Sequence, residues 1–159
     1  DWKRGTIVKI PKKGCLSECN NWRGITLLSV PGKILGKIIF NRISEAVNAH
    51  LRQEQAGFRK GRGCVDHIFT LRNIIEQCTE WQRGLYINFI DFRKAFDSVH
   101  RDTLWKIVQA YGVPHCMIGI IKSYYDGFSC SVGSSDIMFE VKTGVRQGCV
   151  LSTLLFNLV

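Results

Sequence analysis

Residues 85–91, LYINFID, are the stretch that most limits how this chain folds. Bulky side chains occupy both alternating sets of positions, which is typical of a central strand covered on both faces. The run ends at a carboxylate, Asp91, and a buried, unpaired carboxylate costs several kcal/mol of stability. We therefore expect Asp91 to cap a helix, to form an ion pair or to bind a metal.

Periodicity and turn residues predict the elements around this strand. Strands are expected over 5–14 and 22–29, and a hairpin over 128–142 around the turn GSSD. Helices are expected over 29–51, 65–78, 103–111 and 114–125, and a last one after the loop 144–149. This mixed order favours an α+β fold rather than a doubly wound sheet.

The positive charge is concentrated in one part of the chain. Residues 1–62 hold 13 Lys and Arg against 4 Asp and Glu, which accounts for the whole net charge of +9. The other residues, 63–159, hold 9 of each sign. Such an asymmetry favours a polyanionic partner, and nucleic acid is the leading candidate.

The cysteines and the hydropathy bear on the compartment. The seven cysteines are an odd number at irregular spacings, which indicates reduced thiols in a protein of the cytoplasm or nucleus. No window approaches the roughly 18 uninterrupted apolar residues of a membrane span. We expect an intracellular protein without a membrane partner.

Several short motifs carry candidate binding groups. Lys12 in PKKG and Arg23 in NWRG lie on two predicted strands that can pair and bring both cations to one side, where they suit a triphosphate. The loop GFRKGRG at 57–63 offers three cations among glycines, and Gln147 in GVRQGC offers both donors and acceptors. Taken singly, Lys12 and Arg23 are more often surface charges than a binding site, and a simple turn explains the glycines of GVRQGC as well.

The acids Asp91 and Asp97 are a weaker signal on their own. A helix cap together with a surface ion pair explains most such pairs. A metal is the alternative, since Asp91 ends a predicted central strand, where ligand sites of αβ sheets cluster. Mg²⁺ binds carboxylate oxygens and keeps other positions for water and phosphate.

Taken in order, five motifs resemble the reverse transcriptases of non-LTR, LINE-like retrotransposons. The resemblance runs from about Ile7 to Leu158. It rests on IPKKG, NWRGITLLSVPGKILGKIIFNRI, QAGFRKGRGCVDHIFTLRNII, FIDFRKAFDSVHRDTLW and GVRQGCVLSTLLFN. In this family a proline usually follows LS in the last motif, where this chain has Thr153.

The resemblance implies an RNA-directed DNA polymerase that uses an RNA template, a DNA primer and deoxynucleoside triphosphates. Two Mg²⁺ ions, which Mn²⁺ can replace, would perform nucleotidyl transfer. Asp91 would be a catalytic metal ligand, whereas Asp97 would serve local structure. Nucleotide-binding residues would be Lys12, Arg23, Phe96, Arg146, Gln147 and Gly148, with Phe96 as the gate against a 2′-hydroxyl. Nucleic acid would be bound by Lys13, Arg59, Lys60 and Arg62.

By the same resemblance, the chain is a fragment of a right-hand polymerase. We expect a fingers-like basic region at 1–84 and a partial palm at 85–159. The ADD-type hairpin with the other catalytic acids, and the thumb, would lie beyond residue 159. The chain has no initiator Met and ends inside the apolar run LLFNLV, so we expect a piece of a longer protein that is inactive by itself.

Two other functions compete with this interpretation. The chain could be a non-catalytic, nucleic-acid-binding remnant of a retrotransposon whose fold persists without chemistry. It could also be a metal-dependent phosphatase or nuclease that uses Asp91 and Asp97. The second alternative leaves the Lys12 and Arg23 pair and the RQG loop unexplained.

Overall fold

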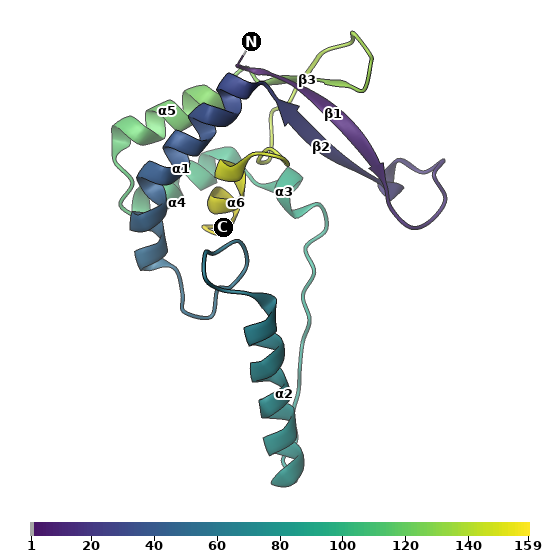
Figure 1. Ribbon diagram of the computed structural model, residues 1–159, viewed down its shortest axis with the longest axis vertical. Helices are drawn as coiled ribbons and strands as arrows, with labels where there is room; N and C mark the ends of the chain where they lie inside the picture. Colours follow the sequence, from purple (N-terminus) through teal and green to yellow (C-terminus); the bar gives the residue numbers. More distant parts are fainter. Residues whose placement is uncertain (1) are drawn as a thin grey trace. The chain divides into compact units, whose positions relative to one another are not determined.

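A β-hairpin near the N-terminus starts the fold, which a computed structural model describes for residues 2–159 (Figure 1). Strands β1 (Arg4–Pro11) and β2 (Trp22–Leu28) pair antiparallel, with Gly5 opposite Leu28 and Pro11 opposite Trp22. The short 3₁₀ helix η1 (Cys19–Asn21) leads into β2. The predicted pairing of these two strands is confirmed.

The hairpin belongs to a sheet of four strands in the order β2-β1-β3-β4. Strands β3 (Ser129–Val132) and β4 (Phe139–Glu140) form the hairpin predicted over 128–142, although β4 is only two residues long. Strand β3 also pairs parallel with β1, so that Arg4 lies opposite Ser129. This pairing leaves one edge of β2 without a neighbouring strand.

Helices supply most of the buried core of this part of the chain. Helix α1 (Val30–His50) begins where the Ser29 Oγ accepts a hydrogen bond from the Gly32 amide at 3.3 Å, as expected of a helix cap. It buries Ile39, Ile43 and Val47, whereas Ile34 and Ile38 of the predicted apolar stripe are exposed. The other helices of this part are α3 (Ala95–Ser98), α4 (Arg101–Ala110), α5 (His115–Tyr125) and α6 (Val150–Phe156).

The C-terminal helix α6 packs on α1 and is the most buried of the short helices. It places Leu151, Leu154 and Leu155 in the core. Thr153 lies within α6, where its Oγ1 donates to the Val150 carbonyl at 2.7 Å. Threonine therefore fits a helical position where the family shows proline.

The chain separates into two compact units. The first comprises residues up to 50 together with Lys94–Val159, and the second comprises Leu51–Arg93. The sheet of the first unit thus combines strands from both of the predicted divisions, 1–84 and 85–159. The second unit contains helix α2 (Cys64–Glu80), which matches the helix predicted over 65–78, and the predicted loop at 57–63.

The predicted central strand at 85–91 is wrong. These residues form no strand, because no other residue within 2–159 pairs its backbone with them. Tyr86 is 98% exposed and Phe89 is 83% exposed. Asp91 is exposed as well, so the cost of burying its carboxylate does not arise in this conformation.

Every helix within residues 2–159 is too short or too polar to span a membrane. The observed secondary structure is a mixture of helices with one sheet. This agrees with the predicted α+β class.

Candidate functional site

Residues 143–149, the 143–149 loop, are the part of the connection between β4 and α6 that carries the RQG motif. This loop lies along the open edge of β2. The Thr26 amide donates to the Gln147 carbonyl at 2.7 Å. Gly148 has φ +116°, and a Cβ at this position would stand 2.4 Å from the Thr26 carbonyl oxygen. Only glycine permits both the backbone angle and the contact. The backbone of the RQG motif is therefore held against the hairpin.

The start of the same loop lies against α3. The Gly144 amide donates to the Val99 carbonyl at 2.9 Å, and the Val145 amide donates to the Phe96 carbonyl at 2.8 Å. Gly144 has φ +75°, and a Cβ there would come within 2.7 Å of the Asp97 Cα. The loop is thus anchored at both ends by backbone contacts that require glycine.

Side chains of the loop and of α3 also meet. The Gln147 Nε2 donates to the Asp97 Oδ1 at 3.3 Å. This bond gives Asp97 a role in holding the loop, in line with the local structural role expected for it. The Phe96 ring stacks on Phe156 of α6, with 4.6 Å between centroids and 17° between planes. The stack fixes the Phe96 ring, which stays partly exposed.

The hairpin presents Lys12 and Arg23 on one face. The Lys12 amide donates to the Asn21 carbonyl at 2.7 Å, which extends the strand pairing by one position beyond Pro11 and Trp22. Arg23 lies opposite Ile10 in the strand register, and Lys12 follows Ile10 by two residues, so alternation along the strand places Lys12 and Arg23 on the same face. The Lys12 Nζ donates to the Asn20 carbonyl at 3.3 Å. Lys12 and Arg23 are both exposed, and Lys13 lies exposed in the following turn.

The face with Arg23 continues toward the loop. Ile25 is two residues further along β2, and its Cγ2 stands 3.5 Å from the position that a Gly148 Cβ would take. Adjacent positions on one face of a strand are about 7 Å apart. The predicted residues Lys12, Arg23 and Gly148 therefore follow one another along a single edge of the first unit.

Arg146 points the other way, into the interior. It is 3% exposed, and its guanidinium carbon lies 4.1 Å, 4.6 Å and 3.7 Å from the ring centroids of Tyr124, Tyr125 and Phe128. Its Nη2 donates to the Tyr124 carbonyl. Burial lowers the pKa of the Arg146 guanidinium from its ordinary value. In this conformation the guanidinium is enclosed by rings and is not open to a nucleotide in solution.

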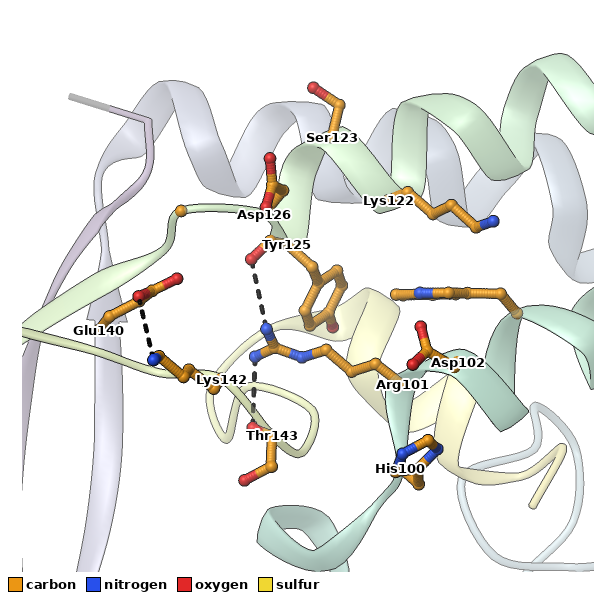
Figure 2. Close-up of a pocket in the computed structure, with 12 residues that line it drawn as sticks. His100, Arg101, Asp102, Lys122, Ser123, Tyr125, Asp126, Glu140, Lys142 and Thr143 are labelled. Carbon is orange, nitrogen blue, oxygen red and sulfur yellow. Dashed lines mark hydrogen bonds and ion pairs between the residues drawn. The ribbon is translucent and has the colours of Figure 1, made fainter.

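A second arginine, Arg101, holds the same loop and was not predicted from the sequence. Figure 2 shows its guanidinium between Tyr125 and Thr143, beside a cavity of about 490 Å³. The Arg101 Nε donates to the Gly144 carbonyl at 3.0 Å, Nη2 to the Thr143 carbonyl at 3.2 Å, and Nη1 to the Tyr125 carbonyl at 3.4 Å. Arg101 lies within the motif FIDFRKAFDSVHRDTLW, but the motif does not indicate this role, because its three acceptors are all backbone carbonyls distant in sequence.

The remaining predicted residues lie in the second unit. Arg59 donates from Nη1 to the Arg52 carbonyl at 2.7 Å, and Arg62 donates to the Gln53 carbonyl and side chain. These two arginines therefore stabilise their own loop, whereas Lys60 is exposed.

Asp91 also lies in the second unit, with no cluster of donors around it. Among residues 2–159 no group of three or more His, Cys, Asp or Glu side chains is placed to share a metal ion. Magnesium prefers six oxygen ligands and is bound through carboxylates. The described residues thus offer one candidate ligand rather than a complete magnesium site.

Comparison with known proteins decides the family. The family model of reverse transcriptase (RNA-dependent DNA polymerase) matches residues 10–159. The chain belongs to the reverse transcriptase family. The predicted resemblance to retrotransposon enzymes of the non-LTR class is confirmed by the relatives.

Three relatives show how much of such a protein this reverse transcriptase chain covers. It is 31% identical to the transposon TX1 uncharacterized 149 kDa protein of Xenopus laevis, over 98% of this chain and 12% of that protein. It is 32% identical to the retrovirus-related Pol polyprotein from type-2 retrotransposable element R2DM of Drosophila melanogaster, over 96% of this chain and 14% of that protein. It is 30% identical to the RNA-directed DNA polymerase from mobile element jockey of Drosophila funebris, over 96% of this chain and 17% of that protein. The chain spans less than a fifth of each of these three proteins.

Proposed function

We propose that this chain is the fingers and partial palm of a right-hand, RNA-directed DNA polymerase from a retrotransposon. The observation that carries the proposal is the attachment of the 143–149 loop to the edge of β2 through Thr26 and Gln147. This attachment gathers Lys12, Arg23 and the RQG loop in one unit of a chain that belongs to the reverse transcriptase family.

The face that results suits a deoxynucleoside triphosphate. Arg23 offers a planar fork of donors and Lys12 a point charge, and together they match the charge and geometry of phosphate oxygens. Gln147 has a side-chain amide next to Gly148, whose lack of a side chain leaves its backbone open to a ligand. We assign the triphosphate to Lys12 and Arg23, and the sugar or base to Gln147 and Gly148.

Phe96 is assigned to selection of the sugar. Its ring is stacked on Phe156 and partly exposed beside the start of the loop. A fixed aromatic face fills the space that a 2′-hydroxyl would need, so deoxynucleotides would be preferred. Stacking on Phe156 keeps the ring from turning away when a nucleotide arrives.

Asp91 is assigned one carboxylate of the catalytic metal site. A divalent ion such as Mg²⁺ or Mn²⁺ would supply charge stabilisation for phosphoryl transfer when bound. Because the described residues offer one such carboxylate, the other ligands would have to come from residues outside this chain. The chain alone would then bind substrate without extending a primer.

Template and primer are assigned to Lys13 and to the basic loop at 57–63. Lys13 and Lys60 are exposed and free to reach phosphates, whereas Arg59 and Arg62 would keep the loop that carries Lys60 in shape. Contacts to phosphates position a nucleic acid without reading its sequence. Binding by this part would therefore be largely independent of sequence.

The test is a titration of the purified chain with a fluorescent deoxynucleoside triphosphate. Arg23→Ala should weaken binding about tenfold, since a charge-assisted contact contributes about 1.5–3 kcal/mol. Arg42→Ala, which removes an exposed arginine from α1, is the matched control and should leave the affinity unchanged. Equal loss in both variants, or no binding by the wild-type chain, would contradict the assignment.

A further inference from the structure

We propose that Arg146 and Arg101 are positioning residues that hold the 143–149 loop from the interior, and that Arg146 does not contact the nucleotide. The consequence for catalysis rests on the proposed function, because the loop that they hold carries Gln147. The holding itself can be measured without any substrate.

The surroundings of Arg146 are those of a structural cation. Three aromatic rings enclose its guanidinium, and its Nη2 donates to the Tyr124 carbonyl. Its Nε and Nη1 are buried without a hydrogen-bond partner among the described residues. Among the described residues no carboxylate forms an ion pair with Arg146 that would compensate its charge. Ring faces attract a cation, and they supply that compensation.

The two arginines act at opposite ends of the same segment. Arg101 binds the carbonyls of Thr143 and Gly144, where the loop begins. Arg146 is itself the residue before Gln147, whose carbonyl accepts the Thr26 amide. With both ends fixed, the segment between them has little freedom, and Gln147 is presented in one orientation.

Tyr125 is the common support of the two arginines. The guanidinium carbons of Arg101 and Arg146 lie 5.2 Å and 4.6 Å from the centroid of its ring. The Tyr125 ring is fully buried, and its hydroxyl is 2.8 Å from the Ser152 Oγ on α6. The helix that follows the loop thus fixes the ring on which both cations rest.

This arrangement separates the roles within the RQG motif. Gly148 allows the close approach to β2, and Arg146 anchors the segment. Gln147 contacts β2 through its backbone carbonyl, and its side chain, held by Asp97, is the part that would meet a nucleotide. A lysine at position 146 would keep the charge but lose the planar group that stacks between rings. Arg146→Lys is therefore a disruptive change, despite its conservative charge.

Hydrogen exchange at the Thr26 amide tests the proposal in the purified 159-residue chain. In Arg146→Lys the Thr26 amide should exchange about tenfold faster, because local opening of the loop exposes it. The Gly133 amide, which donates to the Ile7 carbonyl at 2.9 Å in the same sheet, should keep its protection. Arg42→Lys is the matched control on α1 and should change neither amide.

Arg101→Lys is the second variant, since Arg101 is half-buried and its loss leaves the aromatic core intact. It should also speed exchange at Thr26 while Gly133 stays protected. If Arg146→Lys unfolds the chain and exposes both amides, this second variant decides the matter. Unchanged Thr26 protection in Arg101→Lys, or in a folded Arg146→Lys, would overturn the proposal.

A nucleotide titration of the same variants separates positioning from direct contact. Positioning predicts that affinity for the fluorescent triphosphate falls together with Thr26 protection in both arginine variants. A loss of affinity in Arg146→Lys with Thr26 protection intact would show direct contact and overturn the proposal. If the wild-type chain binds no triphosphate, the proposed function fails, while the exchange measurement still decides whether the arginines hold the loop.

Discussion

Replacing Gly148 with alanine should destabilise the first unit by about 2–4 kcal/mol. At φ +116° an alanine is strained, and a sparsely populated backbone angle costs about 1–3 kcal/mol. The new Cβ would also stand 2.4 Å from the Thr26 carbonyl oxygen, where ordinary contacts begin at 3.4 Å. The loop must therefore move away from β2, and the bond from the Thr26 amide to Gln147 is lost at about 1 kcal/mol.

Gly127→Ala is the matched control for this change. Gly127 also has a positive φ, +61°, but a Cβ there would meet nothing within 4 Å. Its cost should be the backbone strain alone, about 1–2 kcal/mol. The difference between the two variants isolates the close approach of the loop to β2.

Urea denaturation followed by circular dichroism measures both variants against the wild-type chain. The expected order of the free energy of unfolding is wild type, then Gly127→Ala, then Gly148→Ala, with similar slopes against urea. If the two variants lose equal stability, the Gly148 backbone does not approach Thr26 as described. The site would then lack its main structural support.

Three further predictions concern binding, selectivity and pH. The affinity of the chain for a single-stranded oligonucleotide should fall steeply as the salt concentration rises, because phosphate contacts through residues 1–62 release counterions. Equal affinity at low and moderate salt would contradict this prediction. In the longer parent reverse transcriptase, Phe96→Ala should increase ribonucleotide incorporation while deoxynucleotides are still used; single-nucleotide assays with unchanged selectivity would refute the gate. Burial raises the pKa of Tyr124 from 10.0 to about 12 and also raises the pKa of Tyr125. The fold therefore favours the neutral phenols, and the free energy of unfolding should decrease as pH rises from about 10 to about 12. If urea titrations gave the same free energy of unfolding across this pH range, the prediction would be wrong.

Local patterns predicted most helices and both hairpins because their causes are local. The cap at Ser29 and the apolar residues at helical spacing define α1 without reference to distant residues. The hairpin of β1 and β2 likewise joins neighbouring segments. Even within α1 the apolar pattern predicted more buried residues than the structure has. Whether Ile34 is buried depends on which elements pack against that side of the helix, and the spacing of apolar residues does not show this.

The sequence-based predictions fail where the secondary structure depends on residues that are distant in the sequence. The run at 85–91 has the composition of a buried strand, but a strand also needs a partner, and the described residues provide none. The parallel pairing of β1 with β3 joins residues more than a hundred positions apart. No sequence period encodes that pairing.

The candidate site shows the same division. The motifs identified Lys12, Arg23 and the RQG loop, and the hairpin register then placed both cations on one face. The motif could not reveal that Arg146 faces inward, because burial depends on Tyr124, Tyr125 and Phe128 from other elements.

Primer extension on an RNA template tests the central claim most directly. The claim is that this chain carries the nucleotide-binding face and one catalytic carboxylate of a reverse transcriptase. The longer parent protein should extend the primer with Mg²⁺, and Asp91→Ala should abolish extension, whereas Asp136→Ala, at an exposed carboxylate in the turn between β3 and β4, should not. The 159-residue chain should show no extension with Mg²⁺ or Mn²⁺. Full activity in Asp91→Ala, extension by the short chain alone, or an inactive parent protein would each contradict the account, and the last result would favour a non-catalytic, nucleic-acid-binding remnant.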